Sequence, residues 1–181
     1  ILRTQTTINF NEKKLAQHLA TACLQSTYIP PLVDKKIIMI TTKLPIIRPP
    51  EQWFIQDDQS YLRAALTKHG ATIIDEFLLD PKSSDSIAQI DDIITVIKRY
   101  PGATILVQTF FYADAVWNKI QQEWLETLTP LANHKVLISL GHPEEVHIMP
   151  TATTVPLGSF HPPLLDALAQ RLVQPIKQGI D

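Results

Sequence analysis

Short runs of β-branched and aliphatic residues alternate along the chain with segments in which apolar residues recur every three or four positions. The uninterrupted runs predict strands that are covered on both faces, as in a parallel sheet. We expect such strands at 36–41, 71–75, 103–108 and 135–139, with a shorter extended piece near 152–155.

The segments between these runs predict helices, because apolar residues three or four positions apart share one helix face. The expected helices span about 11–25, 58–69, 86 to the break at Pro101, 114–131 and 163–173. In the first helix the stripe expected to be buried consists of Leu15, Leu19, Ala22 and Cys23. In the longest helix it consists of Trp117, Ile120, Trp124, Leu128 and Leu131.

Turn and capping residues mark the ends of these elements. Gly70 follows the second helix, where a residue in the left-handed conformation is common. Ser86 and Gln89 have the spacing of a capping box, which predicts that the Ser86 side chain caps the third helix. Three prolines place residues 43–53 in a loop.

The regular alternation of strand and helix predicts crossover connections and a mainly parallel sheet with helices on both faces. The expected fold is therefore an α/β protein, a three-layer α/β/α sandwich of the flavodoxin-like kind. Residues 1–27 form an N-terminal arm and helix in this interpretation, and residues 28–181 form the sandwich domain.

The composition is that of a globular chain, with 45% hydrophobic and 19% charged residues among 181. Sixteen basic and eighteen acidic residues give a net charge of -2, so the electrostatic footprint of a nucleic-acid binder is missing. No apolar run reaches the length of a membrane span. Cys23 is the single cysteine, which excludes a disulfide within the chain and a cysteine-based metal cluster.

The N-terminus begins at Ile1 without a starting methionine and without the basic and apolar regions of a signal peptide. We therefore expect the chain to be a piece of a longer protein.

Ligands of open α/β sheets bind beyond the carboxyl ends of the strands. The candidate residues near such ends, or in the loops that follow them, are Thr42, Glu76, Thr109, His142, Glu145 and Ser159. No glycine-rich phosphate loop follows the first strand, so nucleotide binding is not supported and no cofactor is expected.

The loop after the fourth strand contains His142, Glu145 and His147, whose spacing matches no established zinc pattern. No metal is therefore expected. Asp75 and Glu76 are adjacent on a strand and point to opposite faces, so they cannot flank one scissile bond. No serine nucleophile motif is present, and the residues alone predict a scaffold without a catalytic set.

Three segments of the second half follow one another in a characteristic order. They are Thr104–Phe111, which leads into a helix containing Trp124–Leu128; Lys135–Pro143, which ends in a Gly-x-Pro turn; and Ala152–Phe160, which is followed by Pro162–Ala169. This order resembles the C-terminal α/β sandwich domain of family 3 glycoside hydrolases, and it is most similar to their bacterial β-N-acetylhexosaminidase branch.

The first half is similar to the run that leads from the catalytic barrel of these enzymes into the sandwich domain. It contains a helix with Ala16 and Ala20, the connector Pro31–Leu32 and the strand at 36–41. The resemblance thus covers roughly residues 10 to 175.

In this family an N-terminal (β/α)8 barrel carries the nucleophilic Asp and, in the N-acetylhexosaminidase branch, a His-Asp acid/base pair. The resemblance therefore implies a non-catalytic domain that packs on a barrel of the same chain and meets carbohydrate substrate through it. The parent enzyme is expected to hydrolyse terminal N-acetylglucosaminides, in the bacterial cytoplasm or as a secreted or cell-wall-associated protein. In the glucosidase branch a sandwich-domain Glu is the acid/base, and Glu76, Glu144 and Glu145 are the loop carboxylates of that type here.

A barrel that covers this domain predicts an exposed apolar docking face. The residues expected to form it are Leu2, Ile8, Phe10, Ile46, Ile47, Trp53 and Phe54. The alternative interpretation is a free-standing flavodoxin-like module that binds a small ligand or a protein.

Overall fold

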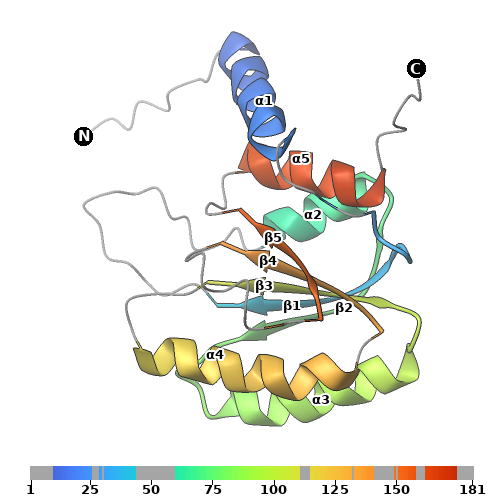
Figure 1. The fold of residues 1–181 in the computed structure, drawn as a ribbon, viewed down its shortest axis with the longest axis vertical. Coiled ribbons are helices and arrows are strands. Elements are labelled where there is room, and N and C mark those ends of the chain that lie inside the picture. Colours follow the sequence, from blue (N-terminus) through green and yellow to red (C-terminus); the bar gives the residue numbers. More distant parts are fainter. Residues whose placement is uncertain are drawn as a thin grey trace, which may run out of the picture.

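A computed structural model gives the structure of the protein (Figure 1). It describes residues 10–25, 29, 31–43, 60–110, 115–131, 133–140, 149, 151–157 and 162–174. The residues predicted to form the docking face lie outside these ranges, except for Phe10, which begins the first helix.

Within the described residues, five parallel strands form one sheet. They are β1 (Lys36–Thr42), β2 (Thr72–Leu79), β3 (Thr104–Thr109), β4 (His134–Ser139) and β5 (Thr153–Pro156). Their order across the sheet is β2-β1-β3-β4-β5, which is the order of flavodoxin-like folds. The predicted parallel α/β sandwich is confirmed.

The helices alternate with these strands, as the periodicity predicts. They are α1 (Phe10–Gln25), α2 (Ser60–Lys68), α3 (Asp85–Arg99), α4 (Ala115–Leu128), the 3-10 turn η2 (Thr129–Leu131) and α5 (Pro162–Val173). The α-helix α4 ends before the predicted position 131, because Pro130 has no backbone N–H to continue the α-helical ladder. Gly70 has a φ of 97°, as expected for the residue that ends α2.

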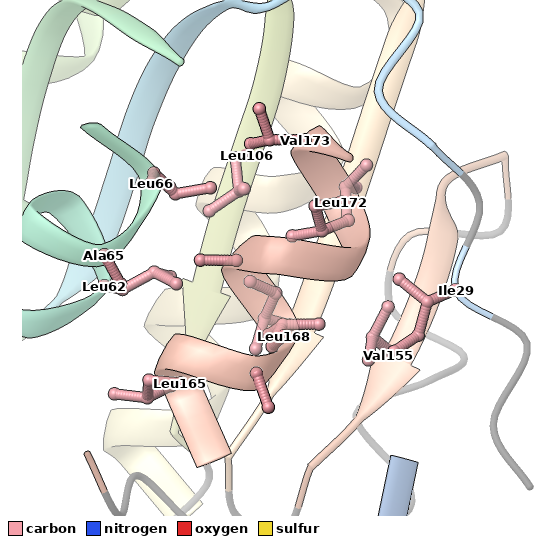
Figure 2. Close-up of a cluster of buried hydrophobic side chains, with 14 of the residues drawn as sticks. Ile29, Leu62, Ala65, Leu66, Leu106, Val155, Leu165, Leu168, Leu172 and Val173 are labelled. Atoms are coloured by element: carbon pink, nitrogen blue, oxygen red, sulfur yellow. The ribbon is translucent and has the colours of Figure 1, made fainter. Parts of the chain in front are cut away.

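The helices α2 and α5 cover one face of the sheet, and α3 and α4 cover the other (Figure 1). Figure 2 shows the core on the first face, where Leu62 and Leu66 of α2 meet Leu165 and Leu168 of α5 above Leu106 of β3. All five side chains are buried. Burying an aliphatic side chain of this size contributes about 1.5–3 kcal/mol, so this face contributes strongly to stability.

The opposite core confirms the predicted stripe of α4. Trp117, Trp124 and Leu128 are buried, and Trp124 and Leu128 pack with Ile93 and Ile97 of α3. The indole rings therefore belong to the core and are not a surface for stacking sugars.

The predicted stripe of the first helix is wrong. Leu15 and Leu19 are 60% and 58% exposed, whereas Ala20 and Leu24 are buried against the α2/α5 core. The helix α1 packs on the outer side of α5 rather than on the sheet (Figure 1). A helix in this outer layer buries a narrower face than a helix that covers a sheet, so the i, i+4 spacing of leucines alone did not identify the face.

The predicted capping box of the third helix is also wrong. The helix α3 begins at Asp85 with Ser84 as its N-cap residue, whose side chain makes no capping hydrogen bond. Ser86 lies inside the helix and is buried. Its hydroxyl donates to the Asp80 carbonyl (2.7 Å) and accepts from the Asp80 N–H (3.2 Å), so Ser86 fixes the turn after β2.

Candidate functional site

The buried polar side chains of the described residues gather where the parallel strands finish. They are Thr41, Thr42, Ser86, Thr104, Gln108, Thr109, Gln121 and Ser139. All except Thr104 lie at, or contact, the carboxyl end of the sheet, which we define as residues 41–43, 79–86, 108–110 and 139–140. This end is where open α/β sheets bind ligands.

The centre of the carboxyl end lies between β1 and β3. The chain passes from β1 to β2 on one side and then crosses back to β3 on the other, so these two strands form the topological switch point. Thr41 pairs with Gln108 in the register of the two strands.

The polar residues of the switch point are divided between the two faces of the sheet. Met39 and Leu106 belong to the α2/α5 core, so Thr41 and Gln108, two positions further along, point to that face. By the same alternation Thr42 and Thr109 point toward the α3/α4 face. The predicted site residues Thr42 and Thr109 thus lie at strand ends, both buried.

The segment after β3 is held by a buried amide from α4. Gln121 Nε2 donates to the Phe110 carbonyl (3.0 Å), and its Oε1 accepts from the Phe110 N–H (3.3 Å). Gln121 is 1% exposed, so both hydrogen bonds are shielded from water. This Gln121 clamp fixes the backbone beside the switch point.

A second contact joins the segments after β1 and β2. Lys43 Nζ lies 2.9 Å from Asp80 Oδ2, and the Lys82 N–H donates to Asp80 Oδ1 (2.9 Å). Burial raises the pKa of Asp80, but these hydrogen bonds and the two lysine charges outweigh burial and hold it below its ordinary value. Asp80 therefore stays ionised at neutral pH and serves to order the turn.

The same turn contacts the start of α4. The Lys82 ammonium lies 5.7 Å from the centre of the Trp117 ring, within the range of a cation–π interaction. The β2–α3 turn and α4 are therefore connected beside the site.

The structure corrects the prediction that Glu76 lies in a loop at a strand end. The strand β2 continues to Leu79, and Glu76 lies inside it, in register with Met39 of β1. Its carboxylate pairs with Arg63 of α2 at 2.8 Å. A charged pair is tolerated there because β2 is an edge strand.

The other predicted site residues, His142, Glu145 and Ser159, lie outside the described residues, as do Glu144 and His147. The structure therefore brings together Thr42 and Thr109 only. Sequence reasoning missed Gln121 and Asp80 as site residues, whereas Thr41 and Gln108 stand at the strand ends where a ligand site was expected.

A third cluster lies away from the carboxyl end, between α2 and α5. Asp166 Oδ1 lies 2.9 Å from Lys68 Nζ and 3.1 Å from His69 Nε2. Burial raises the pKa of Asp166, yet the two hydrogen bonds and positive neighbours keep it below its ordinary value. His69 is mostly buried and paired with Asp166.

Among the described residues, no three His, Cys, Asp or Glu side chains are grouped to hold a metal ion. None of the described helices is long and apolar enough to cross a membrane.

The partly buried carboxylates Glu76, Asp80 and Asp166 are each held by a basic side chain. Besides the paired Lys43 and Asp80 and the exposed Lys82, the described carboxyl end offers buried hydroxyl and carboxamide groups, which suit hydrogen bonding to a neutral ligand.

Comparisons of the chain with protein families, with curated proteins and with solved structures find no match.

Proposed function

We propose that this chain is the C-terminal, non-catalytic sandwich domain of a family 3 glycoside hydrolase that acts on terminal N-acetylglucosaminides. In this proposal the domain packs on a catalytic barrel of the same chain and shapes one wall of its cleft. The observation that carries the proposal is the order of the three resembling segments. They coincide with three consecutive units of the fold, which begin at β3, β4 and β5.

The non-catalytic role is supported by the state of the described carboxylates. Retaining glycosidases need two carboxyl groups, or an equivalent acid/base, about 5 Å apart across the sugar. Glu76 is paired with Arg63, and Asp80 is paired with Lys43. Carboxylates held in this way have structural partners and are poor candidates for a general acid.

The connection to a barrel is supported by the attachment of α1, which the resemblance equates with the run leading out of the barrel. Ala20 and Leu24 of α1 are buried against the core that contains α5. Arg171 of α5 donates to the Leu24 carbonyl in the last turn of α1, where a positive charge is favourable. The helix would therefore enter the sandwich at a defined angle.

The experiment compares the 181-residue chain with the complete product of its gene, using chromogenic N-acetyl-β-D-glucosaminide and β-D-glucoside substrates. We expect the complete product to hydrolyse the N-acetylglucosaminide and the chain alone to give no turnover above buffer. Turnover by the chain alone that disappears in Glu145→Gln would instead identify an independent hydrolase. A complete product without hydrolase activity would favour the binding module.

The binding module is the second candidate, and one observation favours it. Two buried polar atoms at the switch point, on Thr41 and Gln108, have no hydrogen-bond partner among the described residues. The switch point is where flavodoxin-like proteins bind their ligands.

A further inference from the structure

Thr41 Oγ1 and Gln108 Oε1 are buried without a hydrogen-bond partner in the described part of the chain. Thr41 is 1% exposed and Gln108 is 4% exposed. Nearly all buried polar groups of native proteins are hydrogen-bonded, and leaving one without a partner costs about 1–3 kcal/mol. Two such atoms at the switch point therefore call for an explanation.

The two residues are neighbours on one face of the sheet. Thr41 pairs with Gln108 across β1 and β3, and adjacent strands lie about 4.8 Å apart. One small group placed between the two side chains can therefore reach both of them.

The surroundings of the pair are aliphatic. The first turns of α2 and α5 carry Leu62 and Leu165, and both turns lie over this face toward the carboxyl end of β3 (Figure 2). Both leucines are buried in the core that lies on this face. Two charged residues lie near the pair: Lys43, two positions after Thr41, is paired with Asp80, and Glu76 of β2 is paired with Arg63.

These features indicate which kind of ligand group would bind to Thr41 and Gln108. The Gln108 carbonyl oxygen needs a donor, and the Thr41 hydroxyl can donate or accept. A hydroxyl group supplies both functions, whereas an unpaired charge in aliphatic surroundings carries a large desolvation cost. A neutral ligand is therefore favoured over an anion or a cation.

We propose that Thr41 and Gln108 form the floor of a site that binds one hydroxyl group of a small neutral polyol or monosaccharide. This site goes beyond the proposed function, since it belongs to the sandwich domain itself and needs no barrel.

The proposal makes an unusual prediction for stability. Thr41→Val keeps the shape of the side chain and removes a hydroxyl that has no hydrogen-bond partner among the described residues, so the apo chain becomes more stable. We expect its Tm to rise by about 2–4 °C. The same variant loses binding by about tenfold or more, because the ligand hydroxyl loses one of its two partners.

Thr104→Val is the matched control. Thr104 is also 1% exposed and lies at the opposite end of β3, but its hydroxyl donates to the Asp34 carbonyl at 3.2 Å. This variant should lower Tm and leave ligand binding unchanged.

The experiment titrates the chain with glycerol, D-glucose and N-acetyl-D-glucosamine separately, using saturation-transfer NMR at millimolar concentrations and a Tm measurement for each variant. The proposal predicts saturable binding of at least one probe by the wild type, weakened about tenfold or more in Thr41→Val and in Gln108→Leu and retained in Thr104→Val. It is overturned if no probe binds, or if Thr41→Val binds as tightly as the wild type.

A lower Tm in Thr41→Val would also overturn it, because the hydroxyl would then have a partner in the apo protein. A buried water that bridges both side chains would give that result. None of these outcomes depends on hydrolase activity, so the proposed function and this site are tested separately.

Discussion

The two ends of the sheet share backbone hydrogen bonds between segments and differ in the side-chain contacts that supplement them. At the amino end, which we define as residues 31–36, 71–72 and 103–104, the backbone bonds are supplemented by the Thr104 hydroxyl, which donates to the Asp34 carbonyl. The Leu32 N–H donates to the Leu172 carbonyl (2.9 Å), and the Thr72 N–H donates to the Lys35 carbonyl (2.8 Å). At the carboxyl end the backbone also joins neighbouring strands, through the Lys43 N–H and the Leu79 carbonyl (2.8 Å) and through the Leu140 N–H and the Thr109 carbonyl (3.1 Å). Here side chains add the Gln121 clamp and the pairing of Lys43 with Asp80.

This difference determines how each end of the sheet responds to substitutions. Backbone groups are the same in every residue except proline, so the backbone hydrogen bonds at both ends tolerate many side chains. The ion pair and the buried amide at the carboxyl end depend on particular residues, and changing them alters the local chemistry without disturbing the ladder of strands. The carboxyl end is therefore where function can be added and where substitutions should have specific effects.

The largest expected effect tests whether the carboxyl end depends on the Gln121 clamp. Gln121→Leu leaves the Phe110 N–H and carbonyl without their side-chain partner, which should lower the free energy of unfolding by about 2 kcal/mol. Denaturant unfolding monitored by circular dichroism gives this value.

Gln122→Leu is the matched control on the same helix. Gln122 is exposed and bonds only to the neighbouring Glu126 along the helix surface, so its replacement should cost less than about 0.5 kcal/mol. Equal effects of the two variants would show that the clamp does not hold the carboxyl end.

Much of this fold could be predicted from the sequence, because the strands are buried on both faces and read as uninterrupted apolar runs. Ile37 to Ile40 of β1 are all buried, as their sequence indicates. The strand β2 was predicted too short, because Asp75 and Glu76 looked like a strand end. At the edge of a sheet, partly exposed charges can continue a strand.

The candidate site could be predicted in position but not in its contacts. The carboxyl ends follow from the strand predictions, which is why Thr42 and Thr109 were identified. Gln121 lies four residues after Trp117 and three before Trp124, so the stripe of α4 places it on the buried face, unlike Gln122. Its contact with Phe110 joins a helix to the end of the preceding strand and follows from no local pattern. The hydroxyl of Thr41 has no hydrogen-bond partner among the described residues. This depends on the packing of residues that are distant in sequence, which a local pattern does not reveal.

A smaller effect is expected where a side chain attaches α1 to the sandwich. Arg171, in the last turn of α5, donates to the Leu24 carbonyl of α1. Arg171→Met keeps much of the aliphatic stem but removes the charge, so α1 should open more readily by about 1 kcal/mol. Hydrogen exchange should show this loss of protection in α1 and none in β1 or β3.

Arg99→Met serves as the control, because Arg99 is an exposed residue in the last turn of α3. Its replacement should leave the exchange of α1 unchanged. If Arg171→Met lost protection throughout the sheet, α1 and the sandwich would unfold as one unit. That result would contradict the expectation that α1 opens separately from the sheet.

The smallest expected effect concerns pH at the carboxyl end. The pKa of Asp80 in the fold lies below its ordinary value of 3.8, so its ionised form stabilises the native state. This contribution is fully present above pH 3.8 and is lost as the pH falls through the lower folded pKa. Because the partner Lys43 is 42% exposed, the pair contributes only about 0.5 kcal/mol, and salt should weaken it.

Asp80→Asn should therefore be less stable than the wild type at neutral pH and equally stable in strong acid, so the two unfolding curves converge as the pH falls. Both proteins still lose stability in acid through Asp166, whose pKa is also lowered, so the difference between the curves is the informative quantity. Asp92→Asn, at an exposed position on α3, is the control for removing one carboxylate from the surface. A constant difference between Asp80→Asn and the wild type at every pH would mean that shape, and not charge, matters at position 80. The pairing of Lys43 with Asp80 would then not be what closes this part of the carboxyl end.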